Sequence, residues 1–350
     1  MNLDGTIRPF HETFNEPSAP VPPIMTLQPC GTVSLLTVSQ KEYMTRPRCE
    51  RVSMMTNAAL RKVTARIGTT PAPVAFSWQW PGRKDDPTDH FLIRIRRMSD
   101  GRLVGSHQTA RDETERRFAC LENLEVGERY EYEITACDTI GRVQGRGQGC
   151  FRTADESPRF LHAEGLGSFR DLGGRKGICG RRVRQNLVFR SAAFNDNAKH
   201  EKGKPSSPGR MRVGQDVLKD VIERFGIKTD LDIRSDLECW SMTGSPLGPG
   251  VKWIHIPYRA YAGMGAANGK ASFKRAFAVF LDEKNYPIDF HCIGGADRTG
   301  SLAYVLEGLL GMDDESIEKD WEITCFEYES QGFGHKARYD QLLKVFAKYP

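Results

Sequence analysis

The stretch Ile288-Asp289-Phe290-His291-Cys292-Ile293-Gly294-Gly295-Ala296-Asp297-Arg298-Thr299-Gly300 decides the fold of the C-terminal half of the chain. Its first four residues are expected to form a short strand, and residues 301–310 are expected to form a helix. Between them lies a loop in which five residues, two of them glycines, separate Cys292 from Arg298. Such a loop can point successive backbone N–H groups inward, because glycine permits the dihedral angles that this requires.

The composition of this loop predicts a phosphate site with a cysteine nucleophile. The following helix adds partial positive charge at its N-terminus, and Arg298 offers a planar fork to two phosphate oxygens. The same field lowers a cysteine pKa from about 8.5 to roughly 3.5–7.5, and the Thr299 hydroxyl can donate to the sulfur. We therefore expect Cys292 to be a thiolate. The expected phosphate-binding residues are Ile293, Gly294, Gly295, Ala296, Asp297, Arg298 and Thr299.

Three further segments precede the loop in a fixed order: Ser-Phe-Arg-Asp-Leu-Gly-Gly at 168–174, Val-Phe-Arg-Ser-Ala at 188–192, and Gly-Ile-Lys-Thr-Asp-Leu-Asp-Ile-Arg-Ser at 226–235, with Glu238 after it. With the loop, they resemble the bacterial tyrosine phosphatase family that has a Phe-Arg-Asp-Leu-Gly-Gly signature, over about residues 160–345. The resemblance implies one α/β phosphatase domain, a phosphocysteine intermediate and no metal. Ala296 stands where many members have lysine, which argues against a lipid substrate.

The leaving oxygen of a phosphate ester needs a proton, so a general acid is expected near the loop. Many tyrosine phosphatases carry an aspartate upstream of the cysteine strand, but residues 240–280 contain no Asp or Glu. Asp297 is therefore the preferred acid, and the alternative is a structural carboxylate that pairs with Arg170 or another arginine. Asp171 is the reserve candidate. His291 is expected to support the loop by hydrogen bonding, or else to be an ordinary core histidine.

Strand-like and helix-like runs alternate after residue 157, which predicts a mostly parallel sheet flanked by helices. The expected strands are 187–190, 227–233, 252–256 and 288–291, and the expected helices are 216–224, 272–281 and 301–310. Asp232 and Arg234 are expected to form a structural ion pair at a strand end. The polar stretch 195–214 is interpreted as a mobile loop, either a surface insertion or a lid over the site.

Residues 71–155 show a different period, with short alternating runs such as Val74-Ala75-Phe76-Ser77-Trp78 separated by turn residues. This pattern predicts an all-β antiparallel sandwich. Leu121-x-x-Leu124-x-x-Gly127-x-x-Tyr130 and the closing Phe151-x-Thr153 resemble a fibronectin type III domain. The resemblance implies a spacing role, or the binding of a partner that the sequence does not identify.

Residues 1–70 are expected to be largely irregular, with one candidate strand at 33–38, because prolines, serines and threonines are frequent there. The chain is therefore divided into an irregular segment at 1–70, a sandwich at 71–155 and a catalytic domain at 157–350. The change of period near residue 156 predicts that the last of these folds without the sandwich.

Composition narrows the class of protein further. The net charge of +5 is small for 350 residues and accompanies no nucleic-acid motif, so no nucleic acid is expected. No apolar run approaches the ~18 residues that span a bilayer. The nine cysteines form no CxxC pair, which argues against a zinc ribbon and a disulfide scaffold. No metal or other cofactor is expected, and free thiols favour the cytoplasm. Export is the alternative, because fibronectin-like modules of bacteria often work outside it.

The sequence thus favours a phosphatase acting on phosphotyrosine in proteins, with or without phosphoserine and phosphothreonine. The first alternative is an inositol phosphate or phosphoinositide phosphatase, which would need a basic entrance. The second is a module that binds phosphate without turnover, or an adhesion protein in which the sandwich is the main functional part. Candidate residues for the basic entrance are Arg181, Arg182 and Arg184.

Overall fold

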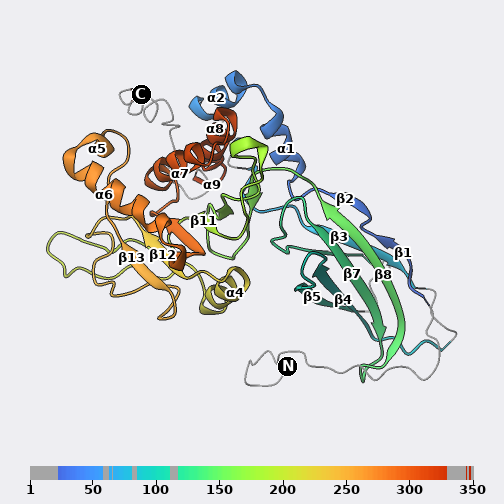
Figure 1. Ribbon diagram of the computed structural model, residues 1–350. Helices are drawn as coiled ribbons and strands as arrows, with labels where there is room; N and C mark the ends of the chain where they lie inside the picture. The colour runs from blue at the N-terminus through green and yellow to red at the C-terminus, as the bar shows by residue number, and fades with distance from the viewer. Residues whose placement is uncertain are drawn as a thin grey trace. The chain divides into compact units, whose positions relative to one another are not determined.

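The computed structural model describes residues 23–57, 63–64, 66–80, 85–110, 117–328, 344 and 347. The chain divides into two compact units, each built from two pieces of sequence. Met1–Val33 and Pro73–Ala154 form the N-terminal unit, whereas Ser34–Ala72 and Asp155–Pro350 form the C-terminal unit (Figure 1). Within the described residues, no helix is both long and apolar enough to cross a membrane.

Every element described in the N-terminal unit is a β-strand (Figure 1). One sheet has the order β1-β3-β6 and the other the order β2-β8-β7-β4-β5. Neighbouring strands are antiparallel, except that β2 runs parallel to β8. The strands are β1 (Met25–Gln28), β2 (Gly31–Val33), β3 (Val74–Gln79), β4 (His90–Arg97), β5 (Leu103–Ala110), β6 (Arg117–Cys120), β7 (Arg129–Cys137) and β8 (Val143–Thr153).

Alternation along the strands builds the core between these two sheets. On β3, Val74, Phe76 and Trp78 are buried while the residues between them are exposed or half-buried. The ring of Phe76 packs edge-on against Tyr132 of β7, with ring centroids 5.0 Å apart. The alternation of residue types in the sequence therefore predicts correctly which side chains of β3 are buried.

The C-terminal unit is organised around a six-stranded sheet with the order β13-β12-β14-β11-β10-β9. The four strands from β13 to β11 are parallel, and β10 and β9 are antiparallel to their neighbours. This arrangement agrees with the mostly parallel sheet that the sequence predicts. The strands are β9 (Arg159–Phe160), β10 (Arg170–Asp171), β11 (Val188–Ser191), β12 (Thr229–Asp232), β13 (Lys252–His255) and β14 (Ile288–His291).

Helices cover both faces of this sheet (Figure 1). α4 packs on one face through Leu218, Val221 and Phe225, and it ends at Gly226, whose φ of 64° suits a left-handed cap. α6, α7 and α8 bury side chains against the other face, together with Phe290 of β14. The helices are α4 (Gln215–Phe225), α5 (Ala262–Gly265), α6 (Ala267–Ala278), α7 (Asp297–Leu309), α8 (Asp314–Ile323) and α9 (Cys325–Tyr328), with short 3-10 turns η1 (Ile178–Gly180), η2 (Val279–Leu281) and η3 (Glu283–Asn285).

The N-terminal segment differs from its expected irregularity. Residues 1–22 lie outside the described part, but residues 38–56 form two helices, α1 (Val38–Thr45) and α2 (Arg48–Thr56). The candidate strand at 33–38 is wrong, because β2 ends at Val33. Thr37 caps α1: its hydroxyl accepts from the N–H of Gln40, whose side chain accepts from the N–H of Thr37. The Thr-x-x-Gln spacing was the sequence signal for this helix.

These two helices belong to the C-terminal unit, so its chain does not begin at residue 157. The ring of Tyr43 packs edge-on against Phe326 with centroids 4.8 Å apart, inside a cluster that also contains Ile323. The buried Arg51 side chain donates through Nε to Glu322 of α8 at 2.8 Å. The segment therefore completes a core that the period change near residue 156 did not reveal.

The architecture predicts that a protein lacking the sandwich will fold if residues 34–72 are retained. Ala72 donates its N–H to the carbonyl of Leu35 at 2.8 Å, and the neighbouring Ser34 hydroxyl contacts Glu156. The two cut ends thus meet, and a short Gly-Ser linker can join residue 72 to residue 155. We expect this protein to unfold cooperatively in urea. Residues 155–350 alone should be less stable, because Phe326 and Ile323 lose their cover.

Tyr43 supplies the matched test in the linked protein. Tyr43→Ala should lower the free energy of unfolding by about 3–5 kcal/mol, as large core truncations do. Tyr43→Phe keeps the ring and loses the hydroxyl that donates to Glu322 at 3.2 Å, so it should cost about 1 kcal/mol. Val38→Ala, at a side chain that is 73% exposed, is the control. Equal stability of the Tyr43→Ala and Val38→Ala proteins would contradict this packing.

Candidate active site

The candidate site lies at the edge where the parallel strands of the C-terminal unit end. β14 is buried along its whole length, and its last residue, His291, pairs in register with Asp232 of β12 and Ser191 of β11. The loop that starts at Cys292 therefore begins at the carboxyl ends of three adjacent strands. Ligands of open α/β sheets bind at this edge.

The loop is held to the scaffold through its carbonyl groups. The Gly295 carbonyl accepts from Arg190 Nη2 at 2.7 Å, and the Ile293 carbonyl accepts from the N–H of Ala193 and from Arg212 Nη1, each at 3.2 Å. The C=O and N–H of a trans peptide unit point in opposite directions. The N–H groups that follow these two carbonyls, those of Gly294 and Ala296, are consequently turned away from the scaffold.

Gly295 is required in this loop for two reasons. Its φ is +66°, a conformation that other residues rarely adopt, and a Cβ there would lie 2.5 Å from the carbonyl oxygen of Ser191. Gly300 has a different role, because a Cβ at that position would lie 2.5 Å from the Trp321 ring. Thus one glycine shapes the loop, and the other lets α8 approach α7.

α7 begins at Asp297, four residues earlier than the sequence predicts, so Asp297 and Arg298 lie in its first turn. The Cys292 thiol is buried, and the backbone N–H of Cys292 donates to the Thr299 hydroxyl at 2.8 Å. Burial alone would raise the pKa of Cys292, but the Arg298 charge and the hydrogen bonds from Thr299 outweigh it and hold this pKa below its usual value. This shift is towards the thiolate form.

Arg298 is held by a carboxylate to which the sequence analysis assigned no role. Its Nη1 and Nη2 donate to the two carboxylate oxygens of Glu238, at 2.6 Å and 2.8 Å. Glu238 itself accepts from the N–H and hydroxyl of Ser235, both at 2.8 Å, and from Asn197 at 3.0 Å. Burial would raise the pKa of Glu238, yet Arg298 and Ser235 lower it to about 2. The pair is therefore ionised and bidentate, which fixes the plane of the guanidinium.

The stretch 195–214, expected to be a mobile loop, folds against the segment that carries Glu238. Asn195 bridges to Met211, and Lys199 bridges to Ser207. The N–H of Ala198 donates to the Glu238 carbonyl at 2.9 Å. The polar stretch therefore fixes the position of the carboxylate that holds Arg298.

Two tyrosines that the sequence analysis did not identify flank the first turn of α7. The Tyr258 hydroxyl donates to the Arg298 carbonyl, and the Tyr261 hydroxyl donates to Asp297 Oδ1. Both follow β13, which ends at the same edge of the sheet as β14. Tyr261 has a φ of 55°, and its ring lies 6.1 Å from that of Trp321. This loop lies within residues 240–280, the stretch upstream of the cysteine strand that contains no Asp or Glu.

Asp171, the reserve acid, is buried and its oxygens are taken up by structural groups. It accepts from Arg159 Nη1 and from the N–H groups of Gly173 and Asn186, each at 2.7 Å. Burial raises its pKa in spite of the Arg159 charge. These partners connect the ends of β9 and β10 to the turn before β11.

Arg170 does not pair with Asp297. Its Nε donates to Asp320 of α8 at 2.8 Å, and Arg175 and Arg190 bind the same carboxylate. Arg190 also donates to the Gly295 carbonyl, so this network reaches the loop. The two motif arginines thus have a structural role: Arg190 binds the loop directly, and Arg170 shares the Asp320 carboxylate with it. These contacts place neither arginine against a substrate.

His291 is fully buried behind the loop. Its Nε2 lies 2.8 Å from Asp230 Oδ1 and its Nδ1 lies 3.3 Å from the Cys292 carbonyl oxygen. Burial would lower the pKa of His291, but Asp232 and Asp230 raise it to about 9, so the ring is protonated at neutral pH. Asp232 forms the expected ion pair with Arg234, at 2.7 Å. His291 is therefore a buried core histidine that also contacts the loop through the Cys292 carbonyl.

The three arginines expected at a basic entrance do not lie there. The turn η1, which comes directly before them in the chain, is bound to the far end of α7, where Ile178 donates its N–H to the Leu310 carbonyl at 2.8 Å. At 1.5 Å per residue, Leu310 is about 20 Å along the helix from Asp297. These arginines are Arg181, Arg182 and Arg184.

The match to a protein-family model supports the class of chemistry that this loop indicates. Residues 212–346 match a family model described as the tyrosine phosphatase family. The chain is similar to the core catalytic domain of the PP-IP phosphatase Siw14 from S. cerevisiae in complex with citrate, with 17% identity over 47% of this chain and 92% of that one and a TM-score of 0.28. A second Siw14 catalytic core gives 17% identity over 47% of this chain and 90% of that one, with a TM-score of 0.25.

A structure described as a myokine is similar over 24% of this chain and 83% of that chain, with 20% identity and a TM-score of 0.20. No curated protein matches the chain. The match to the phosphatase family and the Cys292–Arg298 loop together support a cysteine-dependent phosphatase.

Glu238→Gln tests the positioning of Arg298. The amide cannot accept from both guanidinium nitrogens, and a hydrogen bond to a charged group is worth about 1.5–3 kcal/mol. We expect kcat/KM for an aryl phosphate to fall about 10- to 100-fold. Glu201→Gln, at an exposed carboxylate that pairs with Lys204, is the control. An unchanged kcat/KM in Glu238→Gln would show that Arg298 needs no carboxylate to hold it.

Proposed function

We propose that the C-terminal unit hydrolyses phosphate monoesters through a phosphocysteine at Cys292. The observation that carries the proposal is the geometry of the loop: Thr299 binds the backbone of Cys292, and Glu238 holds the Arg298 guanidinium in one plane. Arg298 and Thr299 also lower the pKa of the Cys292 thiol. A thiolate at the N-terminus of α7 can attack phosphorus while Arg298 and the loop N–H groups bind the equatorial oxygens.

In the first step the sulfur–phosphorus bond forms, the bond from phosphorus to the leaving oxygen breaks, and Asp297 gives that oxygen a proton. In the second step water attacks the phosphocysteine, Asp297 takes a proton from it, and inorganic phosphate and the thiolate are released. The Tyr261 hydroxyl binds Asp297 Oδ1 and so orients the carboxyl group, leaving Oδ2 for proton transfer. The closed hydrogen-bond shell of Asp171 supports Asp297 over Asp171 in this role.

We propose phosphotyrosine in proteins as the substrate, with dual specificity as an extension. Side chains that suit an aromatic leaving group occur near the ion pair of Arg298 along the chain: Tyr261 binds the neighbouring Asp297, and Leu237 and Trp240, one residue before and two residues after Glu238, are 67% and 41% exposed. Ala296 adds no charge within the loop. An aryl ester therefore finds apolar surface where a multiply phosphorylated ring would need cations.

The alternative substrate is an inositol phosphate. Arg212 is the observation that favours it, because this second guanidinium contacts the loop at the Ile293 carbonyl, 3.2 Å away, and also pairs with Asp196. Released from Asp196, it would offer a cation to a second phosphate group. The Siw14 enzyme is described as a PP-IP phosphatase, which makes inositol phosphates a necessary arm of any substrate test.

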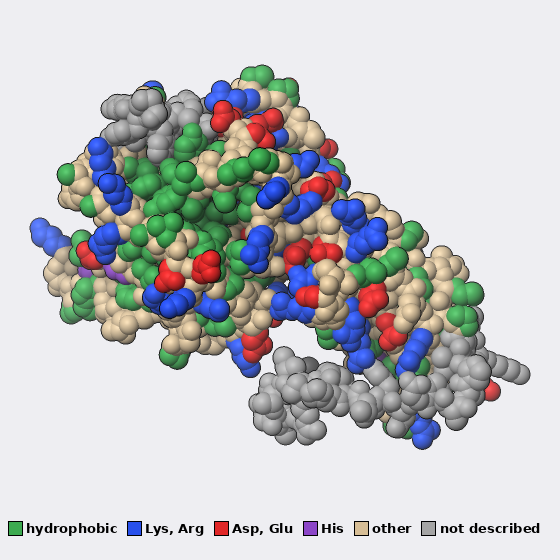
Figure 2. Space-filling view, in the orientation of Figure 1, with side chains coloured by type: hydrophobic (Ala, Val, Ile, Leu, Met, Phe, Trp, Pro, Cys, Tyr) green, Lys and Arg blue, Asp and Glu red, His purple; other side chains and the backbone are tan. Residues whose placement is uncertain are grey.

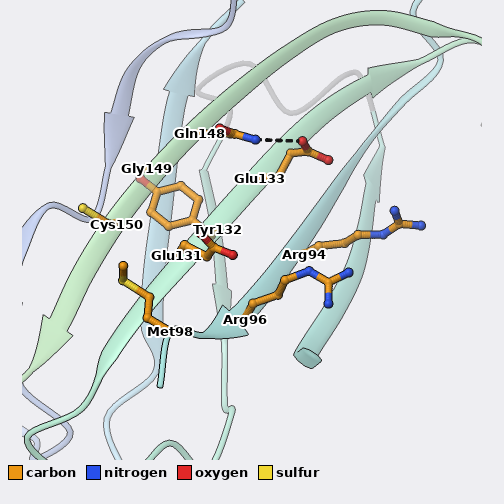
Figure 3. Close-up of a pocket in the computed structure, with 9 residues that line it drawn as sticks. All are labelled: Arg94, Arg96, Met98, Glu131, Tyr132, Glu133, Gln148, Gly149 and Cys150. Carbon is orange, nitrogen blue, oxygen red and sulfur yellow. Dashed lines mark hydrogen bonds between the residues drawn. The ribbon is translucent and has the colours of Figure 1, made fainter. Parts of the chain in front are cut away.

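The N-terminal unit is proposed to be a fibronectin type III-like module that acts as a spacer or binds a partner. A hollow of about 490 Å³ on its five-stranded sheet brings Arg94 and Arg96 of β4 beside Glu131 and Glu133 of β7 (Figure 3). Basic and acidic side chains are likewise interspersed on the face drawn in Figure 2, in keeping with the small net charge. A partner of mixed charge fits such a surface better than a polyanion does.

All nine cysteines are free thiols, which supports a cytoplasmic location.

A substrate panel tests the proposed activity. The purified chain is offered a phosphotyrosine peptide, a phosphoserine peptide and inositol hexakisphosphate, and phosphate release is measured. We expect the phosphotyrosine peptide to give the highest kcat/KM. Cys292→Ser should abolish turnover of every substrate, because an unactivated hydroxyl is a poor nucleophile. Turnover by Cys292→Ser above a few per cent would remove Cys292 as the nucleophile, and fastest release from the inositol compound would favour the alternative substrate.

Asp297→Asn tests the acid. A general acid contributes ~10²–10⁴-fold, and this help matters when the leaving oxygen is strongly basic. The variant should therefore lose far more rate on phenyl phosphate than on nitrophenyl phosphate, and the slope of log rate against leaving-group pKa should steepen.

Asp171→Asn is the parallel variant. Its loss of charge beside the buried Arg159 should lower stability and leave that slope unchanged. A steeper slope in Asp171→Asn, or in neither variant, would show that Asp297 is not the acid.

A further inference from the structure

Three different donor side chains meet in the N-terminal unit, where no chemistry has been assigned. His107 is on β5, an edge strand of the five-stranded sheet, and Cys120 ends β6, an edge strand of the three-stranded sheet. Glu122 follows two residues later. One donor atom from each residue lies within 4.8 Å of the other two, and His107 Nε2 contacts Glu122 Oε1.

The surroundings hold these three groups in place. Cys120 and Glu122 are 7% and 5% exposed, whereas the His107 side chain is 28% exposed. The thiol of Cys120 makes a weak hydrogen bond to the Val74 carbonyl at 3.9 Å. The ring of Phe118 packs against that of His107, with centroids 5.0 Å apart. Two buried donors and one half-buried donor thus converge from two sheets.

Gly105 provides the room for the carboxylate. A Cβ at this position of β5 would lie 2.6 Å from the carboxyl carbon of Glu122 and 2.7 Å from each of its oxygens. Any larger residue would push the carboxylate away from His107. The strand also has a register irregularity beside Gly105, where pairing with β4 shifts between Ile95 and Arg96. The backbone of β5 is thus shaped around the carboxylate.

We propose that His107, Cys120 and Glu122 bind a zinc-class divalent cation. Imidazole nitrogen, thiolate sulfur and carboxylate oxygen are the ligands that zinc takes, whereas calcium and magnesium take oxygen. Bonds of 2.0–2.3 Å around a tetrahedron place donors about 3.5 Å apart. The most widely separated pair of these donors therefore needs to close by about an ångström, whereas His107 and Glu122, which are in direct contact, need to move apart to admit the ion. With three protein donors, a fourth position remains for a water molecule.

Binding of the cation releases one proton and leaves the site with no net charge from the cation and its ligands. Cys120 gives its thiol proton to solvent, and the thiolate and the Glu122 carboxylate together neutralise the two charges of the cation. The bound ion ties β5 to β6, and so joins an edge of each sheet. It should stabilise the N-terminal unit, because the unfolded chain does not hold the three donors together. The catalytic loop belongs to the C-terminal unit, and none of its proposed steps uses this ion.

Cobalt(II) is a suitable probe, because a thiolate ligand gives a near-ultraviolet charge-transfer band and a tetrahedral site gives strong visible bands. The titration uses the reduced full chain carrying Cys292→Ser, which removes the catalytic thiolate as a competing ligand. We expect one equivalent of cobalt to produce both bands, and zinc to displace it. Zinc should also raise the Tm of the same protein, and a chelator should reverse that rise.

Matched variants locate the site. His107→Gln and Cys120→Ser, each in the same background, should lose the charge-transfer band, and Cys150→Ser, at an exposed cysteine of β8, should keep it. Circular dichroism without metal checks that each variant is folded; if Cys120→Ser is not, His107→Gln decides alone, because its half-exposed side chain can be replaced at small cost. Absence of the bands in the parent protein, or their survival in His107→Gln, would overturn the proposal.

Discussion

The guanidinium of Arg190 connects the catalytic loop to the rest of the C-terminal unit. One of its nitrogens binds the Gly295 carbonyl at 2.7 Å, and the other binds Asp320 of α8. The same carboxylate accepts from Arg170 and Arg175, so one buried anion holds three cations beneath the loop. Burial lowers the pKa of Arg190 to about 10 but leaves it charged at neutral pH. Removing one partner of a buried ion pair costs about 3–5 kcal/mol, and here the loop would lose its support as well.

Above this network, each charge near the sulfur is matched by another charge or by hydrogen bonds. Cys292 is buried, and Arg298 and Thr299 lower its pKa in spite of that burial. Arg298 is in turn oriented by Glu238, which accepts from Ser235 and Asn197. In the proposed reaction, a phosphate dianion that enters the loop would meet donors that are already placed, and preorganisation of this kind supplies much of the transition-state stabilisation in enzymes.

Local features were predictable from the sequence, and contacts between distant residues were not. The strand, the loop and the helix around Cys292 follow from neighbouring residues, since glycine spacing and apolar runs act over short distances. Glu238 is 60 residues from Arg298, and no periodicity joins them. The packing of Tyr43 on Phe326, and of His107 with Cys120 and Glu122, likewise depends on how separate elements meet. The irregular segment was misjudged because α1 carries little apolar pattern, although its Thr-x-x-Gln cap was visible.

The central claim is that the loop keeps Cys292 as a thiolate at neutral pH. The most direct test is the rate at which iodoacetamide alkylates Cys292 between pH 5 and pH 9, read from its peptide by mass spectrometry, with the exposed Cys150 as reference in the same digest. The account predicts a half-maximal rate well below pH 8.5, the ordinary midpoint of a thiol being about 8.5, and an upward shift in Thr299→Val. A midpoint at or above 8.5 that Thr299→Val does not move would contradict it.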